Sequence, residues 1–227
     1  MRALTKGREP ASLRAYRAVP GAAYDGADFT AVKDEIREAL LRDQAWLCCY
    51  CMRRISPEAR PHPVNRDAAP VVQMKVEHWR PQSLYPDLAL AWSNLLGACT
   101  GGVGVSPADQ TCDTRKAESV IALNPCDAAH VATLRCTTRG RLTSSNPQFQ
   151  EDLDVRLGLN HRVLVDARRA VIQRAHARLN ASFPTQSWPS GAMRAAIAEA
   201  EASSGGRAPE LCGTLRLWTR GRFGGEP

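Results

Sequence analysis

The sequence contains no long apolar run. No segment of its 227 residues approaches the length of a membrane span, and the opening, MRALTKGREPASLRAYRAVPG, lacks the apolar stretch of a secretory signal. These two absences argue against a membrane protein and a secreted protein, and they favour the cytoplasm. The sequence also has no internal repeat, so a repeat architecture is not expected.

Lysine is scarce, and arginine carries almost all of the positive charge. The formal net charge of +7 fits a polyanionic partner, because an excess of cationic side chains attracts phosphates whatever their sequence. The chain is also rich in alanine, and a biased genomic composition explains both features equally well. Charge alone therefore leaves nucleic-acid binding open.

Cysteine, in contrast, is more abundant than stability requires. A chain of this length buries a sizeable core without cross-links, and grouped cysteines in a reducing cytoplasm are more often metal ligands or free thiols than disulfides. Cys48 and Cys51 have the C-x-x-C spacing at which two thiolates bind one tetrahedral zinc ion. Cys99 and Cys112 are the expected remaining ligands, since the glycine-rich insert between them can loop out; ordinary buried thiols are the alternative. The cysteines without a partner at ligand spacing are Cys49, Cys126, Cys136 and Cys212.

The first half of the chain predicts a helix followed by strands. Residues 28–47 have apolar side chains at helical spacing, with Asp28 available as the N-cap, and this helix leads into the first cysteine pair. The proline-rich residues 56–70 are expected to form a loop. The other predicted elements of this half are a strand at 71–79, a second short strand or buried turn at 88–99, and a short helix at 113–123.

The second half predicts a hairpin and then helices. The strand-like stretches ATLRCTT and RLTSS flank Arg139 and Gly140, which suit the turn between them. Residues 160–180 have the strongest helical pattern, and a further helix is expected at 191–202. The apolar face of the longer helix comprises Val163, Leu164, Ala167, Val171 and Ala175, and the opposite, arginine-bearing face comprises Arg168, Arg169, Arg174 and Arg178.

That arginine-bearing face is expected to be solvated, with contact to a phosphate backbone or an acidic partner as the alternative. Trp188 and Trp218, near the end of the chain, leave a similar choice open. Docking of a partner and packing into the core both explain these tryptophans.

A group of polar residues lies between the two cysteine pairs in the sequence. Glu77 and His78 end the predicted strand, Asn94 lies in WSNLL, and CDTRK opens the predicted short helix. The pattern C-x-Y-C, E-H-x-x-P-x-S, W-x-N-L-L and C-D-x-x-K resembles the HNH endonucleases, whose ββα-metal fold has a catalytic histidine at the end of its first strand. Shorter matches, in the opening residues, at 123–125 and at 157–172, resemble the PtuB nucleases of Septu and retron-associated anti-phage systems.

The chemistry of these residue types fits phosphodiester hydrolysis independently of the family. That reaction needs an activated water and a cation that neutralises charge on the phosphorane and on the leaving oxygen. His78 is the candidate general base, because a neutral imidazole accepts a proton from water near pH 7. Glu77 and Asp113 offer hard oxygen donors, which suit Mg²⁺ or Mn²⁺ better than zinc.

The resemblance implies a role for each residue of the motif. Glu77 and Asp113 correspond to the two metal ligands, and Asp113 stands at the start of the last helix of the core. Asn94 belongs to the catalytic motif, where it braces the loop between the strands. Lys116 stands where some members have histidine, which leaves open whether it touches phosphate or caps the site. The expected contacts with nucleic acid are Lys116, Arg80 and Arg115.

The sequence thus predicts an α+β protein whose ββα-metal core is held by a structural zinc and surrounded by helices and a small β-hairpin. The expected parts are an N-terminal segment with an amphipathic helix (1–47), the zinc-framed nuclease core (48–125), a hairpin and arginine-rich helix packed on that core (126–184), and a C-terminal helical tail that is a candidate partner-docking segment (185–227).

Two functions of different classes are compatible with this sequence. The first is an HNH endonuclease that cuts DNA or RNA; in the family it is the effector of an anti-phage system beside a PtuA-type ATPase and, in retron-associated loci, a reverse transcriptase with its nucleic acid. The second is a catalytically silent, zinc-stabilised module that binds nucleic acid or a partner. The intact His78, Glu77 and Asp113 favour the first. No segment resembles a base-reading helix or an aromatic platform for RNA, so the sequence does not identify the substrate.

Overall fold

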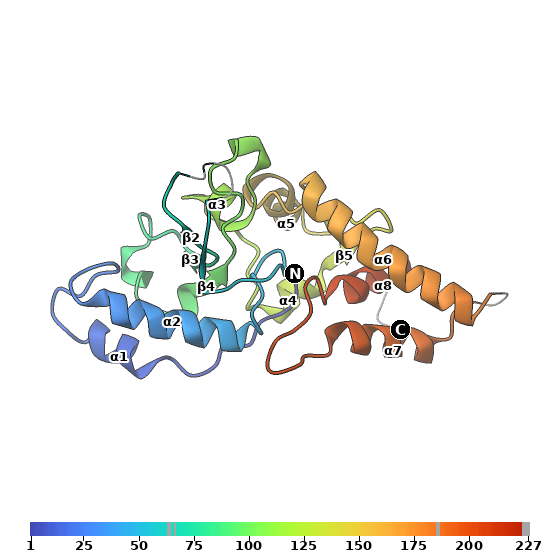
Figure 1. Cartoon of the computed structure of the whole chain (residues 1–227), viewed down its shortest axis with the longest axis horizontal. Coiled ribbons are helices and arrows are strands. Elements are labelled where there is room, and N and C mark those ends of the chain that lie inside the picture. Colours follow the sequence, from blue (N-terminus) through green and yellow to red (C-terminus); the bar gives the residue numbers. More distant parts are fainter. Residues whose placement is uncertain (63–64, 66, 185–186, 224–227) are drawn as a thin grey trace.

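The computed structural model describes residues 1–62, 65, 67–184 and 187–223. Within these ranges the fold combines helices with short antiparallel hairpins, which confirms the predicted α+β class. Figure 1 shows α1 and α2 at one end of an elongated molecule and α6, α7 and α8 at the other, with the small strands between them. The helices are α1 (Ala11–Arg17), α2 (Phe29–Asp43), α3 (Cys112–Lys116), α4 (Ala128–Ala132), α5 (Pro147–Glu151), α6 (Arg162–Ser182), α7 (Ser190–Glu201) and α8 (Thr214–Phe223).

The strands are short and pair only in twos. They are β1 (Ala59–Arg60), β2 (Val71–Val72), β3 (Lys75–His78), β4 (Leu95–Ala98), β5 (Leu134–Cys136) and β6 (Leu142–Ser144). The pairs are β1 with β2, β3 with β4, and β5 with β6, all antiparallel. Among the described residues, no helix is long and apolar enough to cross a membrane.

The amphipathic helix predicted after Asp28 is α2, and its apolar side chains, including Phe29, Ile36 and Leu40, are buried. The predicted N-cap is wrong. Asp28 precedes the helix with a left-handed backbone (φ 58°), and its side chain accepts no hydrogen bond from the first turn. An N-cap normally has an extended backbone, which aims the side-chain oxygen at the free N–H groups of the first turn.

The strand predicted at 71–79 is interrupted. β2 pairs with β1, which arises inside the stretch predicted to be a loop, whereas β3 pairs with β4. The loop prediction for 56–70 is therefore wrong at Ala59–Arg60, where the backbone hydrogen-bonds to β2. Three residues of that stretch, 63, 64 and 66, lie outside the described residues.

β3, β4 and α3 follow one another along the chain and form the region around the predicted site. In the β3–β4 hairpin Glu77 lies opposite Leu96, and His78 lies opposite Leu95. β4 confirms the second short strand, and all four of its residues are buried. The predicted helix at 113–123 is shorter than expected, because the backbone turns out of the helix at Ala117 (φ 45°).

The hairpin predicted around Arg139 and Gly140 is confirmed by β5 and β6. Gly140 has φ 85°, and a Cβ there would lie 2.2 Å from the carbonyl oxygen of Val165 in α6. Only glycine suits this position, because the turn needs a positive φ and the backbone of α6 leaves no room for a side chain. The hairpin and α6 are thus packed closely at this point.

α6 confirms the long helix but changes its predicted faces. Leu164 and Ala175 are buried as expected, whereas Val163 is 56% exposed. Arg168, assigned to the solvated face, is 1% exposed. Its guanidinium donates hydrogen bonds to the carbonyl oxygens of Gly140 (2.7 Å) and Leu159 (2.6 Å), so the long side chain satisfies backbone groups in the interior.

The C-terminal segment packs on the rest of the molecule. α7 confirms the helix predicted at 191–202, and α8 contacts both β5 and α6. Trp218 is buried, and its ring centre lies 5.8 Å from that of Trp188, which is partly buried against the core. Core packing therefore accounts for Trp218. Of the predicted docking segment, residues 185–186 and 224–227 lie outside the described residues.

Candidate functional site

Four cysteines converge from three separate segments. Cys48 and Cys51 lie in the turn after α2, Cys99 follows β4, and Cys112 is the first residue of α3. Their sulfur atoms all lie within 4.8 Å of one another, and no other group of three or more potential metal ligands occurs in the described part of the chain. The predicted four-cysteine set is therefore brought together as expected.

The geometry of this four-cysteine cluster fits a zinc ion. Zn–S bonds of about 2.3 Å in a tetrahedron separate the sulfurs by roughly 3.8 Å, and the sulfurs of Cys51 and Cys99 are 3.7 Å apart. None of the four is in a disulfide, and all but Cys99 are fully buried. The donor set is the Cys₄ type found at structural zinc sites, with no position left for a substrate.

The glycine-rich insert returns the chain to the cluster. Thr111 donates its N–H to the carbonyl oxygen of Gly101, and Gly101 has φ 56°. A Cβ at Gly101 would lie 2.0 Å from the carbonyl oxygen of Thr111. The absence of a side chain therefore allows the two ends of the insert to touch, which brings Cys112 beside Cys99.

The protonation of the buried thiols also fits a cation. Although burial acts to raise it, hydrogen bonds from neighbouring thiols, that of Cys112 foremost, bring the pKa of Cys48 well below its usual range. Hydrogen bonds with Cys48 and the other cluster thiols, together with burial, raise the pKa of Cys112 well above that range. A metal ion that binds thiolates would release the remaining protons from such a group.

Glu77 and Asp113 lie together beside the cysteine cluster. Glu77 is 2% exposed and Asp113 is the second residue of α3, and each carboxyl group shifts the pKa of the other. Burial, and then Asp113 itself, raises the pKa of Glu77 well above its usual range. Burial acts to raise the pKa of Asp113, but its interaction with Glu77 and the charge of Lys75 outweigh burial, and the pKa is lowered. Burial and the neighbouring carboxyl group therefore oppose the charged form of Glu77, whereas the charge of Lys116 favours it.

Two of the chain's few lysines face this pair of acids. The ammonium of Lys116 lies 3.0 Å from Oε1 of Glu77, and the ammonium of Lys75 lies 3.0 Å from Oδ2 of Asp113. The hydroxyl of Tyr50 donates to Glu77 over 2.7 Å. The carboxyl groups are therefore surrounded by donors, which satisfies buried polar atoms that would otherwise be costly.

His78 is the last residue of β3 and directly follows Glu77. Its Nε2 is 2.9 Å from the carbonyl oxygen of Ala89. A carbonyl oxygen only accepts, so Nε2 carries the proton and Nδ1 keeps a free lone pair. Burial lowers the pKa of His78, so the imidazole is neutral near pH 7. These are the properties of a general base.

Asn94 braces the loop that follows β3. Its Oδ1 accepts from the N–H of Arg80 (2.7 Å), and its Nδ2 donates to the carbonyl oxygens of Arg80 and Leu88 (3.1 Å each). Asn94 is 3% exposed. Its side chain thus holds together the two ends of the 80–88 segment, which carries the chain from His78 towards Ala89.

The three residues predicted to contact nucleic acid all make internal contacts. The ammonium of Lys116 also donates to the carbonyl oxygen of His78 (2.9 Å), and the side chain is 1% exposed. Arg80 stacks on the ring of Trp79, with 4.0 Å between the guanidinium carbon and the ring centre. Arg115 donates to the carbonyl oxygens of Val155 (2.9 Å) and Pro107 (2.8 Å). Their contact with nucleic acid stays a prediction.

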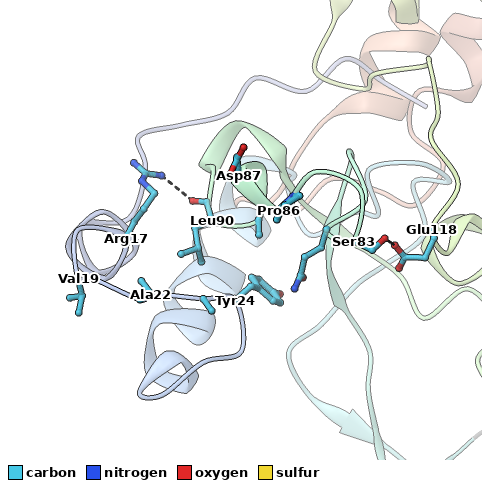
Figure 2. Close-up of a pocket in the computed structure, with 13 residues that line it drawn as sticks. Arg17, Val19, Ala22, Tyr24, Ser83, Pro86, Asp87, Leu90 and Glu118 are labelled. Atoms are coloured by element: carbon cyan, nitrogen blue, oxygen red, sulfur yellow. Dashed lines mark hydrogen bonds between the residues drawn. The ribbon is translucent and has the colours of Figure 1, made fainter.

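A pocket of about 830 Å³ adjoins His78. Two of its lining residues contact the histidine: Ala89 accepts its hydrogen bond, and the ring of Tyr24 lies edge-on to the imidazole. Figure 2 shows the pocket between the segment that bears Arg17 and Tyr24 and the loop that bears Ser83 and Leu90. Asp87 and Glu118 add two carboxyl groups to its lining.

The remaining histidines make contacts elsewhere in the molecule. His130 accepts a hydrogen bond from the N–H of Asn124, His161 pairs with Asp109, and His176 packs on Trp188. The N–H of Asn65 donates to His62. Four further cysteines do not belong to the four-cysteine cluster: Cys49, which adjoins Cys48 in the chain, and Cys126, Cys136 and Cys212.

Tyr50, Lys75 and Tyr24 are site residues that the sequence patterns did not predict. Tyr50 lies inside the C-x-Y-C motif, so the sequence offered a reason to consider it. Lys75 precedes Glu77 by two positions, and residues two apart in a strand lie on the same face, so it could also have been found from the sequence. Tyr24 comes from a distant segment, and nothing near it in the sequence indicates its place.

No family model matches the chain. The chain is similar to a protein of Vibrio cholerae serotype O1 biovar El Tor described as "Retron Vc95 putative HNH endonuclease". The two are 25% identical over 186 residues, which cover 75% of this chain and 82% of the relative. This chain is therefore a distant homologue of a retron-associated protein so described.

Proposed function

We propose that this protein is a metal-dependent HNH endonuclease that hydrolyses phosphodiester bonds in DNA or RNA. The observation that carries the proposal is the order β3, β4, α3 over the four-cysteine cluster, with His78 at the end of β3 and Asp113 at the start of α3. This order matches the ββα-metal arrangement that the motif resemblance implies, and the distant homology supports it.

His78 is the proposed general base. Its Nδ1 would take the proton from the attacking water, while the hydrogen bond from Nε2 to Ala89 keeps the ring in one orientation. The pocket beside it gives a substrate access to this part of the molecule. Asn94 would act indirectly, because it holds the 80–88 segment that precedes Ala89.

Glu77 and Asp113 are the proposed ligands of Mg²⁺ or Mn²⁺. Each carboxyl group shifts the pKa of the other, which supports a shared site, and one or two carboxylates with water and substrate phosphate are the usual surroundings of Mg²⁺. A bound ion would supply charge neutralisation at the phosphate. The four cysteines would hold a separate zinc whose role is structural.

A catalytically silent binding module is the second candidate, and one observation favours it. Glu77 is almost fully buried, and its carboxyl group is engaged by Lys116, Tyr50 and Asp113. A divalent ion would have to displace part of this set. If it cannot, the fold would bind nucleic acid or a partner without cutting it.

The biological setting is proposed from the resemblance and from the relative's name. In that setting the protein is an effector of anti-phage defence that acts with a PtuA-like ATPase and, in a retron, with a reverse transcriptase and its nucleic acid. Arg80 and Arg115 are the proposed phosphate contacts. Lys116, first considered as a phosphate contact, is 1% exposed and bonded to Glu77 and His78, so its proposed role is to cap the site. Residues 185–227 are the proposed docking segment. Since Trp218 is buried, docking would use other side chains of that segment.

A cleavage assay tests the proposal. Plasmid, single-stranded DNA and tRNA are incubated with Mg²⁺ or Mn²⁺, with wild type, His78→Ala and the control His176→Ala, each with and without the neighbouring ATPase. We expect cutting that needs the divalent ion, is lost in His78→Ala and is kept in His176→Ala. Metal-dependent cutting that survives His78→Ala contradicts the mechanism, and binding without cutting under all conditions supports the silent module.

A further inference from the structure

The ring of Tyr24 lies against the imidazole of His78. The ring centres are 4.4 Å apart and the planes meet at 79°, an edge-to-face contact of the kind that aromatic pairs prefer. We propose that Tyr24 is a positioning residue that holds His78 in the orientation in which Nε2 donates to Ala89 and Nδ1 is free. This proposal rests on the proposed function of His78 as general base.

The imidazole needs a second restraint besides its hydrogen bond. The torsion between Cβ and the ring of a histidine is broad and roughly two-fold, and one hydrogen bond at Nε2, worth about 1 kcal/mol net, only weakly opposes a swung or turned ring. A turned ring would exchange the places of its nitrogen and carbon atoms and would remove the lone pair of Nδ1 from its position. The edge-to-face contact with Tyr24 blocks these alternatives from the side.

Tyr24 is itself held by the start of α2. Its ring centre lies 4.7 Å from that of Phe29, the first residue of that helix, and the ammonium of Lys33 lies 5.0 Å from the tyrosine ring centre. Lys33 also pairs with Asp25, the residue after Tyr24, over 2.7 Å. The segment that carries Tyr24 is therefore tied to α2 at three points, which suits a rigid support.

The contact links the N-terminal segment to the site. Tyr24 and Ala89 both line the pocket of Figure 2, and both contact His78, one through its ring and one through its carbonyl oxygen. Two walls of the pocket thus set the position of the same side chain. Placement of a reacting group within a fraction of an ångström is worth a large factor in rate, because a misplacement of about 1 Å can cost roughly 100-fold.

The test uses Tyr24→Phe, which keeps the ring, and Tyr24→Leu and Tyr24→Ala, which remove it. Long-range ¹H–¹⁵N NMR of the histidine side chains reports the tautomer, and the signals of His78 are assigned by their absence in His78→Gln. We expect a single Nε2–H tautomer in wild type and Tyr24→Phe, and averaged nitrogen shifts in folded Tyr24→Leu or Tyr24→Ala. Tyr24→Leu retains much of the apolar volume. If Tyr24→Ala unfolds, Tyr24→Leu still provides a folded variant that lacks the ring.

Cleavage rates give the second readout. We expect kcat to fall about 10- to 100-fold in Tyr24→Leu with KM within about twofold, and Tyr24→Phe to stay near wild type. A single Nε2–H tautomer and an unchanged kcat in Tyr24→Leu overturn the positioning role while leaving the nuclease intact. If wild type does not cleave, the proposed function fails, and the NMR comparison still shows whether Tyr24 holds the ring.

Discussion

The ammonium of Lys116 lies 3.0 Å from Oε1 of Glu77, and the two side chains are 1% and 2% exposed. The same ammonium donates to the carbonyl oxygen of His78. One side chain at the end of α3 therefore holds both consecutive residues of the Glu-His motif on β3. This contact joins the helix to the hairpin without any metal ion.

Lys116→Met should destabilise the protein by about 3 kcal/mol, because it leaves Glu77 buried without its cation and leaves the carbonyl oxygen of His78 without its donor. The control is Arg178→Met. Its pair with Glu199 has side chains 54% and 65% exposed, so solvent screens the pair and the expected loss of stability is much smaller. Urea unfolding measures both. Equal losses in the two variants would show that the buried pair is no more important than the exposed one.

The zinc prediction concerns the four-cysteine cluster. Freshly purified protein should contain about one zinc ion per chain, with Zn–S distances of about 2.3 Å by X-ray absorption. Cys51→Ser should lose the zinc and unfold at lower urea, because a structural metal contributes directly to folding. Cys126→Ser, outside the cluster and partly exposed, serves as the control. If purified wild type contains no zinc and Cys51→Ser folds normally, the cluster is not a metal site.

Asn94→Ala should cost about 1 to 3 kcal/mol, because it leaves part-buried backbone groups of Arg80 and Leu88 without their hydrogen-bond partner. Asn94→Asp should be no better, since a carboxylate cannot donate to the two carbonyl oxygens. Ser93→Ala, at the exposed neighbouring position, should change stability by less than about 0.5 kcal/mol. Thermal unfolding together with hydrogen exchange over residues 80–88 measures the effect; unchanged exchange there in Asn94→Ala would argue against the brace.

Adjacent arginines of α6 should respond differently to the same change. Arg168→Leu leaves the carbonyl oxygens of Gly140 and Leu159 unsatisfied in the interior, and we expect a loss of about 2 to 4 kcal/mol. Arg169→Leu removes an ion pair with Asp166 whose arginine is 48% exposed, and the expected loss is about 1 kcal/mol or less. Denaturant unfolding measures the loss of stability in each variant. A larger loss for Arg169→Leu than for Arg168→Leu would contradict the assignment of Arg168 to the buried face of α6 and Arg169 to the exposed face.

Lys6 should make stability depend on pH in the alkaline range. Burial lowers its pKa to about 8, while the unfolded chain keeps the usual value of about 10.4. Between these values the unfolded state binds a proton that the folded state has released, so the contribution of Lys6 to the free energy of unfolding rises as pH increases.

The comparison of wild type with Lys6→Met isolates that contribution from the titration of the thiols. Between pH 8 and 10 we expect the free energy of unfolding of wild type to rise by about 1 to 2 kcal/mol relative to that of the variant. The full shift is not expected, because the ring of Trp92, 3.6 Å from the ammonium, and the carbonyl oxygens of Trp92 and Leu95 favour the charged form. A difference that is constant over this pH range would contradict the lowered pKa.

Local patterns in the sequence were sufficient for most elements of the fold. The apolar period of 28–47 and 160–180 predicted α2 and α6, and the turn residues Arg139 and Gly140 predicted the β5–β6 hairpin. Helical periodicity and turn chemistry depend on neighbours a few residues away, so they are visible in the sequence. The predictions at Asp28, at the end of α3, within 56–70 and for one continuous strand at 71–79 failed at element boundaries, which are the least visible feature of a sequence. The assignment of Val163 and Arg168 to the faces of α6 failed because their burial depends on which segments pack against that helix.

The sequence by itself determined which residues could form a site. The C-x-x-C spacing and the later cysteines indicated the cluster, because thiolates at that separation share one ion, and the types and order of Glu77, His78, Asn94 and Asp113 indicated the chemistry. Only the tertiary structure decided their surroundings: Lys116 is buried against Glu77, Ala89 fixes the tautomer of His78, and Tyr24 lies against that ring. The physical reason is that desolvation and hydrogen bonding depend on which segments pack together, and the segments that meet here are far apart in the chain.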